Sequence, residues 1–431
     1  MQKSWIKNFD ELAITENRKS ALKIMEAGLD AINTIEVIKN NIKLENNILS
    51  LNDESFDLSK FKKIKVVGFG KSSCEAALAL ENILESRITD GVVIGLAKVS
   101  TKYIETFAGT HPRASEKNVI AGNKIYEIIK DSTEEDLIIV LASGGGSALL
   151  CYPESEYKQA AKLYEAFLKT GGTISEMNTI RKHLSLVKGG GLAKIAYPAT
   201  IIGLIFSDVP GDVLEDVASG PTYKDSTTIE DVKKIITENK LGEFHLIETP
   251  KEDKYFEKVH NFVLVSNKTA VEAMTKKAEE FNLGVNIIST NLYDEVTEAL
   301  KKIFAKQTDN SVCLAAGEPR IVVPPNGGKG GRNLHMGLSV IKNKLVEKED
   351  LENSVFISFA SDGMDNSDVS GAVIDRNTIE KAEKLGLDVG DFLNRFDSYN
   401  FFQKTGDLII TGPTGANVSD LMILLSKKEN L

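Results

Sequence analysis

The first residues with a chemical signature lie in a glycine loop at positions 68–73, GFGKSS, which follows a β-branched run. A phosphate-binding P-loop has four residues between its first glycine and GK[ST], and this loop has one. Ser73 stands where a dinucleotide-binding fingerprint has glycine. An ammonium group at a strand-to-helix turn, beside free backbone N–H groups, suits an anion. Lys71 is therefore a candidate anion ligand, and the alternative is a solvated lysine on a tight turn.

A second loop, SGGGS at 143–147, follows a strand that contains no charge. Three consecutive glycines cost backbone entropy. Close approach of backbone amides to a carboxylate or phosphate explains them better than a merely tight turn. Further along, NTIRKH at 178–183 gathers basic and amide side chains in a chain whose formal net charge is -10. This segment indicates an anion pocket, and the alternative is a solvated charged face.

Two aspartates follow apolar strands, a position suited to holding Mg²⁺ or orienting a hydroxyl group. Asp208 lies in SDVPGD, where Asp212 could equally be a turn residue or helix cap, and Asp362 lies in SDGMD. A glycine run with Lys and Arg, GGKGGRN at 327–333, leads into a predicted helix and indicates a phosphate cradle. Cations, a metal and a positioned nucleophile are the parts that phosphoryl transfer requires.

The elements that must position these loops alternate between apolar strands and amphipathic helices. This pattern predicts an α/β fold with a mostly parallel sheet covered on both faces. One helical period extends from Arg18 to about Asn41. The stretch from Thr237 to Lys258 has the least hydrophobic pattern, and we expect the domain boundary there. The predicted domains are residues 1–240 and residues 241–431. Expected strands begin at residues 63, 91, 136 and 199 in the first domain and at 262, 284, 312 and 355 in the second.

The composition excludes several classes of protein. Hydrophobic residues make up 42% and charged residues 26%, which is ordinary for a globular enzyme. The negative net charge disfavours nucleic acid as a partner. Cys74, Cys151 and Cys313 lie far apart in apolar contexts, so we expect buried thiols and neither zinc nor disulfides. The N-terminus lacks the apolar core of a signal peptide, and no apolar run reaches the roughly 20 residues that span a bilayer. We therefore expect a cytoplasmic enzyme with no membrane partner.

Nine motifs, in order, resemble the glycerate 2-kinase family, which comprises the class II glycerate kinases with a MOFRL-type C-terminal domain. They are GKSS (70–73), THPRAS (110–115), LASGGGSALL (141–150), ISEMNTIRKHLSLVKGGGLA (174–193), SDVPGD (207–212), ASGPT (218–222), GKGGRN (328–333), SDGMD (361–365) and TGPTGANVSDL (411–421). The match is collinear from about residue 18 to the end. One such motif would be a weak signal, whereas nine in order are specific.

The resemblance implies ATP- and Mg²⁺-dependent conversion of D-glycerate to 2-phosphoglycerate. It implies an active site in a cleft between a Rossmann-like α/β/α domain and a smaller α/β domain, and it leaves a homodimer open. The implied catalytic residues are Lys71, Arg332 and Asp208, and the implied metal ligands are Asp208 and Asp362. The acid or the transferred phosphate is expected at Ser143, Gly144, Gly145, Gly146, Ser147, Asn178, Arg181 and Lys182. The nucleotide is expected at Gly317, Glu318, Lys329, Gly330 and Gly331.

The chain departs from the family pattern at three places that bear on the substrate. Gly191 stands where the family has arginine, Arg113 stands in the place of the valine of an HPVP motif, and His335 stands in the place of the glutamate of an NQE motif. These departures leave the reaction class intact, and they leave the identity of the acid open.

Two other functions compete with this interpretation. An NAD(P)-dependent hydroxypyruvate reductase would need an intact dinucleotide fingerprint, which Ser73 breaks. It would also need an acidic residue after the next strand, where the chain reads Ala97-Lys98. A non-catalytic sensor of sugar acids would not need Lys71, Arg332 and two aspartate loops together. The sequence therefore favours the kinase.

Overall fold

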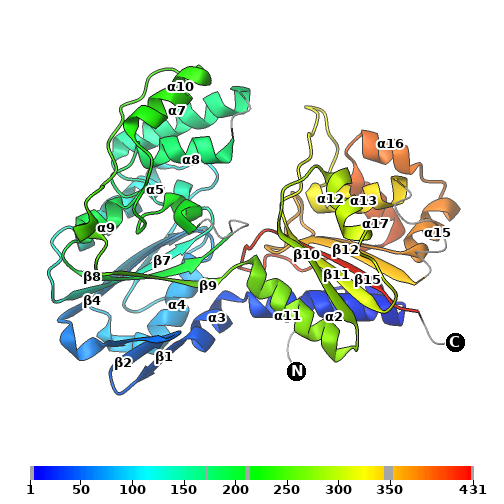
Figure 1. Cartoon of the computed structure of the whole chain (residues 1–431), viewed down its shortest axis with the longest axis horizontal. Helices are drawn as coiled ribbons and strands as arrows, with labels where there is room; N and C mark the ends of the chain where they lie inside the picture. Colours follow the sequence, from blue (N-terminus) through cyan, green and yellow to red (C-terminus); the bar gives the residue numbers. More distant parts are fainter. Residues whose placement is uncertain (1–3, 171–172, 209–213, 344–352, 429–431) are drawn as a thin grey trace. The chain divides into compact units, whose positions relative to one another are not determined.

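The computed structural model describes residues 4–170, 173–208, 214–343 and 353–428, and the chain forms two compact units (Figure 1). One unit is contiguous and comprises residues 34–265. The other combines residues 1–33 with residues 266–431. This division differs from the expected boundary at 240 in two respects, because the N-terminal segment packs with the C-terminal half and residues 241–265 pack with the first.

The contiguous unit is built on a six-stranded sheet in which all neighbouring strands are parallel. Its order across the sheet is β6 (Glu105–Ala108), β5 (Asp90–Gly95), β4 (Lys63–Phe69), β7 (Asp136–Ser143), β8 (Thr200–Phe206) and β9 (Val259–Val265). The chain therefore winds outward from β4 in one direction and then from β7 in the other. This is the strand order of dinucleotide-binding folds, with its switch point between β4 and β7. The predicted Rossmann-like sheet is confirmed.

Helices cover both faces of this sheet (Figure 1). The strands are almost wholly buried and apolar, as a sheet covered on both faces requires. Valines and isoleucines of β4 and β7 pack against α5 (Glu116–Ile129) and α9 (Gly191–Ala196) on one face, and α4 (Ser73–Leu84) packs on the other. The unit also contains α3 (Thr34–Asn41), β1 (Ile42–Glu45), β2 (Ile48–Leu51), β3 (Glu54–Asp57), α6 (Gly146–Leu149), α7 (Glu154–Thr170), α8 (Ile174–Lys182) and α10 (Ile229–Glu238).

The other unit is built on a mixed six-stranded sheet. Its order is β10 (Gly284–Leu292), β11 (Ser311–Gly317), β15 (Asp420–Ser426), β12 (Ser354–Ala360), β13 (Gly371–Ile374) and β14 (Leu408–Ile409). Only β10 and β11 are parallel among its described pairs. One face carries α2 (Glu16–Ala31) and α11 (Asn267–Glu280) (Figure 1). The other carries α12 (Val296–Phe304), α13 (Arg332–Lys342), α15 (Arg376–Lys384), α16 (Val389–Asn394) and α17 (Ser398–Thr405).

Two sequence predictions about elements are wrong. The single helix expected from Arg18 to Asn41 is two helices, because α2 ends at Ala31 and α3 begins at Thr34. The apolar period continues through the break, but its two parts bury their faces in different units. The strand expected at 262 in the second domain is β9, which instead pairs with β8 at the edge of the parallel sheet. The two-domain α/β architecture itself is confirmed. None of the helices in the described parts of the chain is both long and apolar enough to cross a membrane.

A buried ion-pair cluster fastens the N-terminal segment to its unit. Arg18 on α2 is fully buried, and its Nε and Nη2 donate to the two carboxylate oxygens of Asp375 at 2.7 and 2.6 Å. Its Nη1 donates to Asp407 at 2.8 Å. A buried charge is tolerated when it is paired and hydrogen-bonded in this way. Arg18 therefore links α2 to segments more than three hundred residues away.

Arg18→Met should destabilise this unit by about 3–5 kcal/mol, because the buried Asp375 would lose its cation and Asp407 would keep only Lys381, at 3.4 Å. The only tryptophan of the chain, Trp5, lies in the same unit and donates to Asp30 at 2.7 Å. Urea unfolding followed by Trp5 fluorescence therefore reports on the unit directly. Lys19→Met is the matched control, since Lys19 pairs with Glu16 on the exposed side of the same helix. Equal unfolding midpoints for the two variants would contradict the role given to Arg18.

Candidate active site

The candidate ligand residues of the contiguous unit come from strand ends that are neighbours in the sheet. Lys71 follows β4, the glycine loop at 143–147 follows β7, and Asp208 follows β8. Ligands of open α/β sheets bind beyond the carboxyl ends of strands at the switch point, which here lies between β4 and β7. The backbone N–H of Lys71 donates to the carbonyl of Gly144 at 2.8 Å, so the two loops touch.

The glycines at 144–146 have separate structural reasons. A Cβ at Gly144 would lie 2.0 Å from Oδ2 of Asp208, so only glycine lets this carboxylate approach the loop. Gly145 has a φ of +78° and is the N-cap of the short helix α6, and Gly146 lies against Ala218. The loop therefore brings backbone close to Asp208, whereas the sequence predicted close approach to a ligand.

The two serines of this loop are engaged within the protein. Oγ of Ser143 accepts from the backbone N–H of Ser72 at 3.1 Å, which holds the Lys71 turn against β7. Oγ of Ser147 lies 2.8 Å from Oγ of Ser219. Ser143 thus supports the Lys71 loop, and Ser147 also lines the cavity described next.

A cavity of about 280 Å³ opens beside these loops. Its polar lining includes His111, Ser147, Asn178, Arg181 and Asp208, so it unites residues from widely separated segments. Arg181 Nη1 donates to Asn178 Oδ1 at 3.3 Å, and no carboxylate of the described residues lies within ion-pair distance of this guanidinium. A half-buried guanidinium of this kind suits a ligand carboxylate or phosphate, which it can bind through two N–H groups.

His111 is a polar residue of this cavity that sequence reasoning did not single out as a ligand. Burial lowers its pKa, and the positive charges of Lys71 and Arg181 lower it further, to about 4. The ring is therefore neutral at pH 7 and can donate or accept one hydrogen bond. A Cβ at Gly145 would lie 3.1 Å from Cδ2 of His111 and 3.2 Å from Cγ of Lys71, so both side chains border this glycine, and Arg181 lines the same cavity as His111.

Lys182 is placed differently from the other residues expected to bind the acid. Its side chain is buried, and its Nζ lies 3.4 Å from Asp225 and 3.6 Å from Asp216. It does not line the cavity, although Asp216 does. Asp212, the other aspartate of SDVPGD, lies outside the described residues.

The second cluster of predicted residues lies in the discontinuous unit around Arg332, the first residue of α13. Its Nη1 lies 3.1 Å from Glu318, just after β11, and its Nε lies 3.0 Å from Asp420, the first residue of β15. Gly317 and Asp420 are paired in register across these antiparallel strands. The sheet therefore fixes both carboxylates that flank the guanidinium.

A buried aspartate that sequence reasoning did not single out holds the start of α13. The carboxylate of Asp365 accepts from the backbone N–H groups of Asn333 and Leu334 at 3.0 and 2.8 Å. The side chain of Asn333 donates both to Asp365 at 3.1 Å and to Asp420 at 2.8 Å. A Cβ at Gly331 would lie 2.3 Å from Asp365 Oδ1. The GGRN motif is therefore shaped around this carboxylate.

The other predicted residues of this unit lie around the same loop. Asp362 belongs to the same motif as Asp365, and its Oδ1 accepts from the backbone N–H of Met364 at 3.0 Å. Lys329 pairs with Asp368 at 3.0 Å and lies over the ring of Tyr399, and Gly330 has a φ of +143°. Asp420 could have been suspected because a carboxylate at the head of the apolar run LMILL needs a partner. No cluster of three or more acidic, histidine or cysteine side chains placed to hold a metal occurs in the described parts of either unit.

Comparison with known proteins identifies relatives of the whole chain. A family model described as a domain of unknown function, DUF4147, matches residues 20–248, and the MOFRL family model matches residues 311–420. A glycerate 2-kinase of Pyrococcus horikoshii is 33% identical over 95% of this chain and 97% of its own. A D-glycerate 2-kinase of Thermotoga maritima is 30% identical over 94% and 97%. The crystal structure of a glycerate kinase from Thermotoga maritima superposes with a TM-score of 0.81 at 30% identity and covers 95% of this chain and 99% of that one.

The buried carboxyl of Asp420 generates a prediction about pH. Burial raises its pKa to about 8 against the opposing charge of Arg332, whereas an unfolded aspartate has a pKa of about 3.9. Between these values the folded state binds more protons than the unfolded state, so the free energy of unfolding falls as pH rises through the window. Asp420→Asn should flatten this fall, measured by urea unfolding at pH 5 and pH 8 with Trp5 fluorescence.

The control for this experiment is Asp388→Asn, which replaces the exposed capping carboxylate of α16 in the same unit by an amide that can still cap the helix. It should leave the difference in stability between pH 5 and pH 8 unchanged. If the Asp420→Asn protein keeps the wild-type difference between pH 5 and pH 8, the carboxyl does not titrate in this window.

Proposed function

Because this chain belongs to the glycerate 2-kinase family, we propose that it uses ATP and Mg²⁺ to phosphorylate the 2-hydroxyl group of D-glycerate. The observation that carries the proposal is the cavity beside the switch point, which Arg181 and Asp208 line and which the Lys71 loop adjoins at Gly145. Phosphoryl transfer needs little beyond positioning and stabilisation of the charge on the phosphoryl oxygens. The cavity and the adjoining Lys71 loop supply these groups from loops at the sheet edge and from α8.

We assign the acid to the cavity wall formed by α8 and the loop after β7. Arg181 would bind the carboxylate of glycerate in a bidentate manner, with Asn178 and Ser147 as further hydrogen-bond partners. Lys71 would neutralise charge on the phosphoryl group. The neutral ring of His111 adds no competing positive charge, and it offers one donor to the hydroxyl groups of the acid.

The chemistry of the carboxylates fits Mg²⁺, which prefers oxygen ligands and is usually held by one or two carboxylates together with substrate phosphates. The approach of Asp208 to the loop backbone at Gly144 would aim one such carboxylate at the cavity. Asp362 is the candidate ligand of the other unit. Bound Mg²⁺ would neutralise phosphate charge, and the side chains named here would orient the acid.

In the discontinuous unit we propose Arg332 as a cation that stabilises phosphoryl charge. Glu318 and Asp420 would orient its guanidinium. The nucleotide is assigned to Gly317, Glu318, Lys329, Gly330 and Gly331, as the family resemblance implies. The three cysteines are buried and free, which agrees with the proposed cytoplasmic location.

The kinase and the reductase make opposite predictions in one pair of assays. With D-glycerate and Mg²⁺, the enzyme should release ADP from ATP, and with hydroxypyruvate it should not oxidise NADH. The expected absence of reduction rests on Ser73, which occupies a fingerprint position, and on the lack of an acidic residue after β5. Rapid NADH oxidation without ATP would overturn the proposal.

Lys71→Ala and Arg332→Ala should each lower kcat by a factor on the order of 10³, because each cation is assigned to charge that develops in the transition state. The matched controls are Lys62→Ala and Arg376→Ala, which remove exposed cations paired with Glu135 and Glu380. Both controls should keep wild-type turnover. Near-normal kcat in a folded Lys71→Ala or Arg332→Ala protein would remove that residue from the mechanism.

A further inference from the structure

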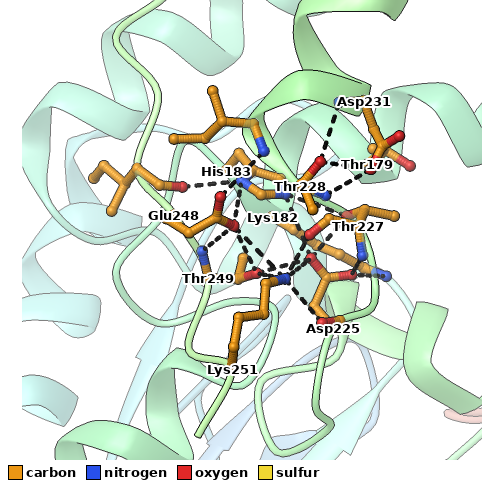
Figure 2. A network of polar contacts seen from close by, with 12 residues as sticks. Thr179, Lys182, His183, Asp225, Thr227, Thr228, Asp231, Glu248, Thr249 and Lys251 are labelled. Atoms are coloured by element: carbon orange, nitrogen blue, oxygen red, sulfur yellow. Dashed lines mark hydrogen bonds and ion pairs between the residues drawn. The ribbon is translucent and has the colours of Figure 1, made fainter.

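A polar network surrounds the C-terminal end of α8, the helix that carries Asn178 and Arg181 (Figure 2). At its centre lies Asp225, whose side chain is 1% exposed. The network includes two lysines, a histidine and several threonines from three segments of the contiguous unit. Lys182, which the sequence predicted to bind the acid, belongs to this network and does not line the cavity.

The carboxylate of Asp225 binds both residues that follow Arg181. Its Oδ1 lies 3.4 Å from Nζ of Lys182, and its Oδ2 lies 3.5 Å from Nε2 of His183. It also accepts from the hydroxyl groups of Thr227 and Thr249 at 2.7 and 3.0 Å. Burial alone would raise the pKa of Asp225, but the hydrogen bonds from His183 and Thr227 and the charge of Lys182 hold that pKa well below its usual range.

The same network joins two loops to the end of the helix. Lys251 donates to the carbonyls of Asp225 and Thr227 at 2.9 and 2.5 Å and to the hydroxyl of Thr249 at 2.6 Å. Nδ1 of His183 lies 3.0 Å from the carbonyl oxygen of Ile247. The segments at 225–228 and 247–251 are therefore fastened to α8 as one body (Figure 2).

This fastening matters because the apolar support of α8 is small. Ile180 and the following Leu184 pack into a satellite cluster with four other buried side chains, which are Leu163, Phe167, Val232 and Leu241. The N-terminal end of α8 has a capping box formed by Thr173 and Glu176. At the C-terminal end, the carbonyl of His183 accepts from the backbone N–H of Ile247 at 2.7 Å. There, the side chains of Lys182 and His183 hold the backbone in place through Asp225.

We propose that Asp225 is a positioning residue for the acid substrate. By holding Lys182 and His183, it fixes the last turn of α8, and this turn presents Arg181 and Asn178 to the cavity. The inference rests on the proposed function, in which Arg181 binds the substrate carboxylate. A displacement of about 1 Å in a positioning group can cost as much as 10²-fold in a reaction. Asp225 thus sets the affinity for the acid without touching it.

The test is Asp225→Asn, which keeps the shape of the side chain and removes its charge. We expect KM for D-glycerate to rise by about tenfold or more, while KM for ATP stays within about twofold. A merely structural role would lower the melting temperature without separating the two KM values. An unchanged KM for D-glycerate in the folded variant would overturn the proposal.

The matched control is Asp231→Asn. Asp231 lies six positions further along and accepts from the backbone and side chain of Thr228 at 2.8 Å each, in the capping box of α10 (Figure 2). Its replacement should lower the melting temperature and leave both KM values unchanged. If Asp225→Asn does not fold, Thr249→Val decides, since it removes one hydrogen bond to the carboxylate. A rise of about twofold to threefold in KM for D-glycerate supports the proposal, and no rise overturns it.

A second measurement separates this inference from the proposed function. If wild-type protein neither binds nor phosphorylates D-glycerate, the proposed function fails. The anchoring of α8 is then judged by hydrogen exchange of the backbone amides at 181–184. Asp225→Asn should accelerate this exchange by at least about tenfold relative to wild type and to Asp231→Asn. Equal exchange in all three proteins would overturn the anchoring.

Discussion

The candidate site of the contiguous unit depends on one topological constraint, the reversal of strand order between β4 and β7. Parallel strands on either side of this point direct their following loops in opposite directions along the sheet edge, which leaves room for a ligand. The Lys71 loop and the glycine loop flank the reversal, and the hydrogen bond between Lys71 and Gly144 joins them. Asp208 follows the next strand and reaches the glycine loop only because residue 144 has no side chain.

In two places in the discontinuous unit, an arginine lies between two carboxylates. Arg18 lies between Asp375 and Asp407, and Arg332 lies between Glu318 and Asp420. The first guanidinium is fully enclosed by protein and has every charged partner within the unit. The second is 30% exposed, so it can present part of its surface to a ligand. The difference in exposure separates a structural arginine from a candidate catalytic one.

Much of the fold was predictable because the apolar strands and the glycine loops after them are local signals. The strands after which Lys71, Gly144 and Asp208 appear were all expected, and the α/β class followed from them. The break between α2 and α3 was not predictable, since the apolar period continues although its two parts pack in different units. The edge strand β9 was assigned to the second domain, although it pairs with β8 in the first. The sequence of a strand does not indicate which strand it pairs with.

Site residues were predictable where a charged residue or a glycine loop directly follows a strand. They were less predictable where burial decides whether a charged side chain binds a ligand or pairs within the protein. Arg181 and Lys182 are adjacent and both cationic, yet one lines the cavity and the other is paired with Asp225. On a helix, neighbouring residues point about 100° apart, so their environments differ. The roles of Asp365 and Asp420 were not predicted, because their partners Asn333 and Arg332 lie far from them in the sequence. Only the folded sheet brings these groups together.

The discontinuity of the second unit has a consequence for the order in which the molecule is assembled during synthesis. The helix α2 packs against α11, β12 and β15, and its Arg18 needs Asp375 and Asp407. All of these emerge from the ribosome after the contiguous unit has been completed, and chains generally fold by domains as they emerge. The apolar face of α2, one of the first helices to be synthesised, therefore stays uncovered until β15, the last described strand, has been synthesised.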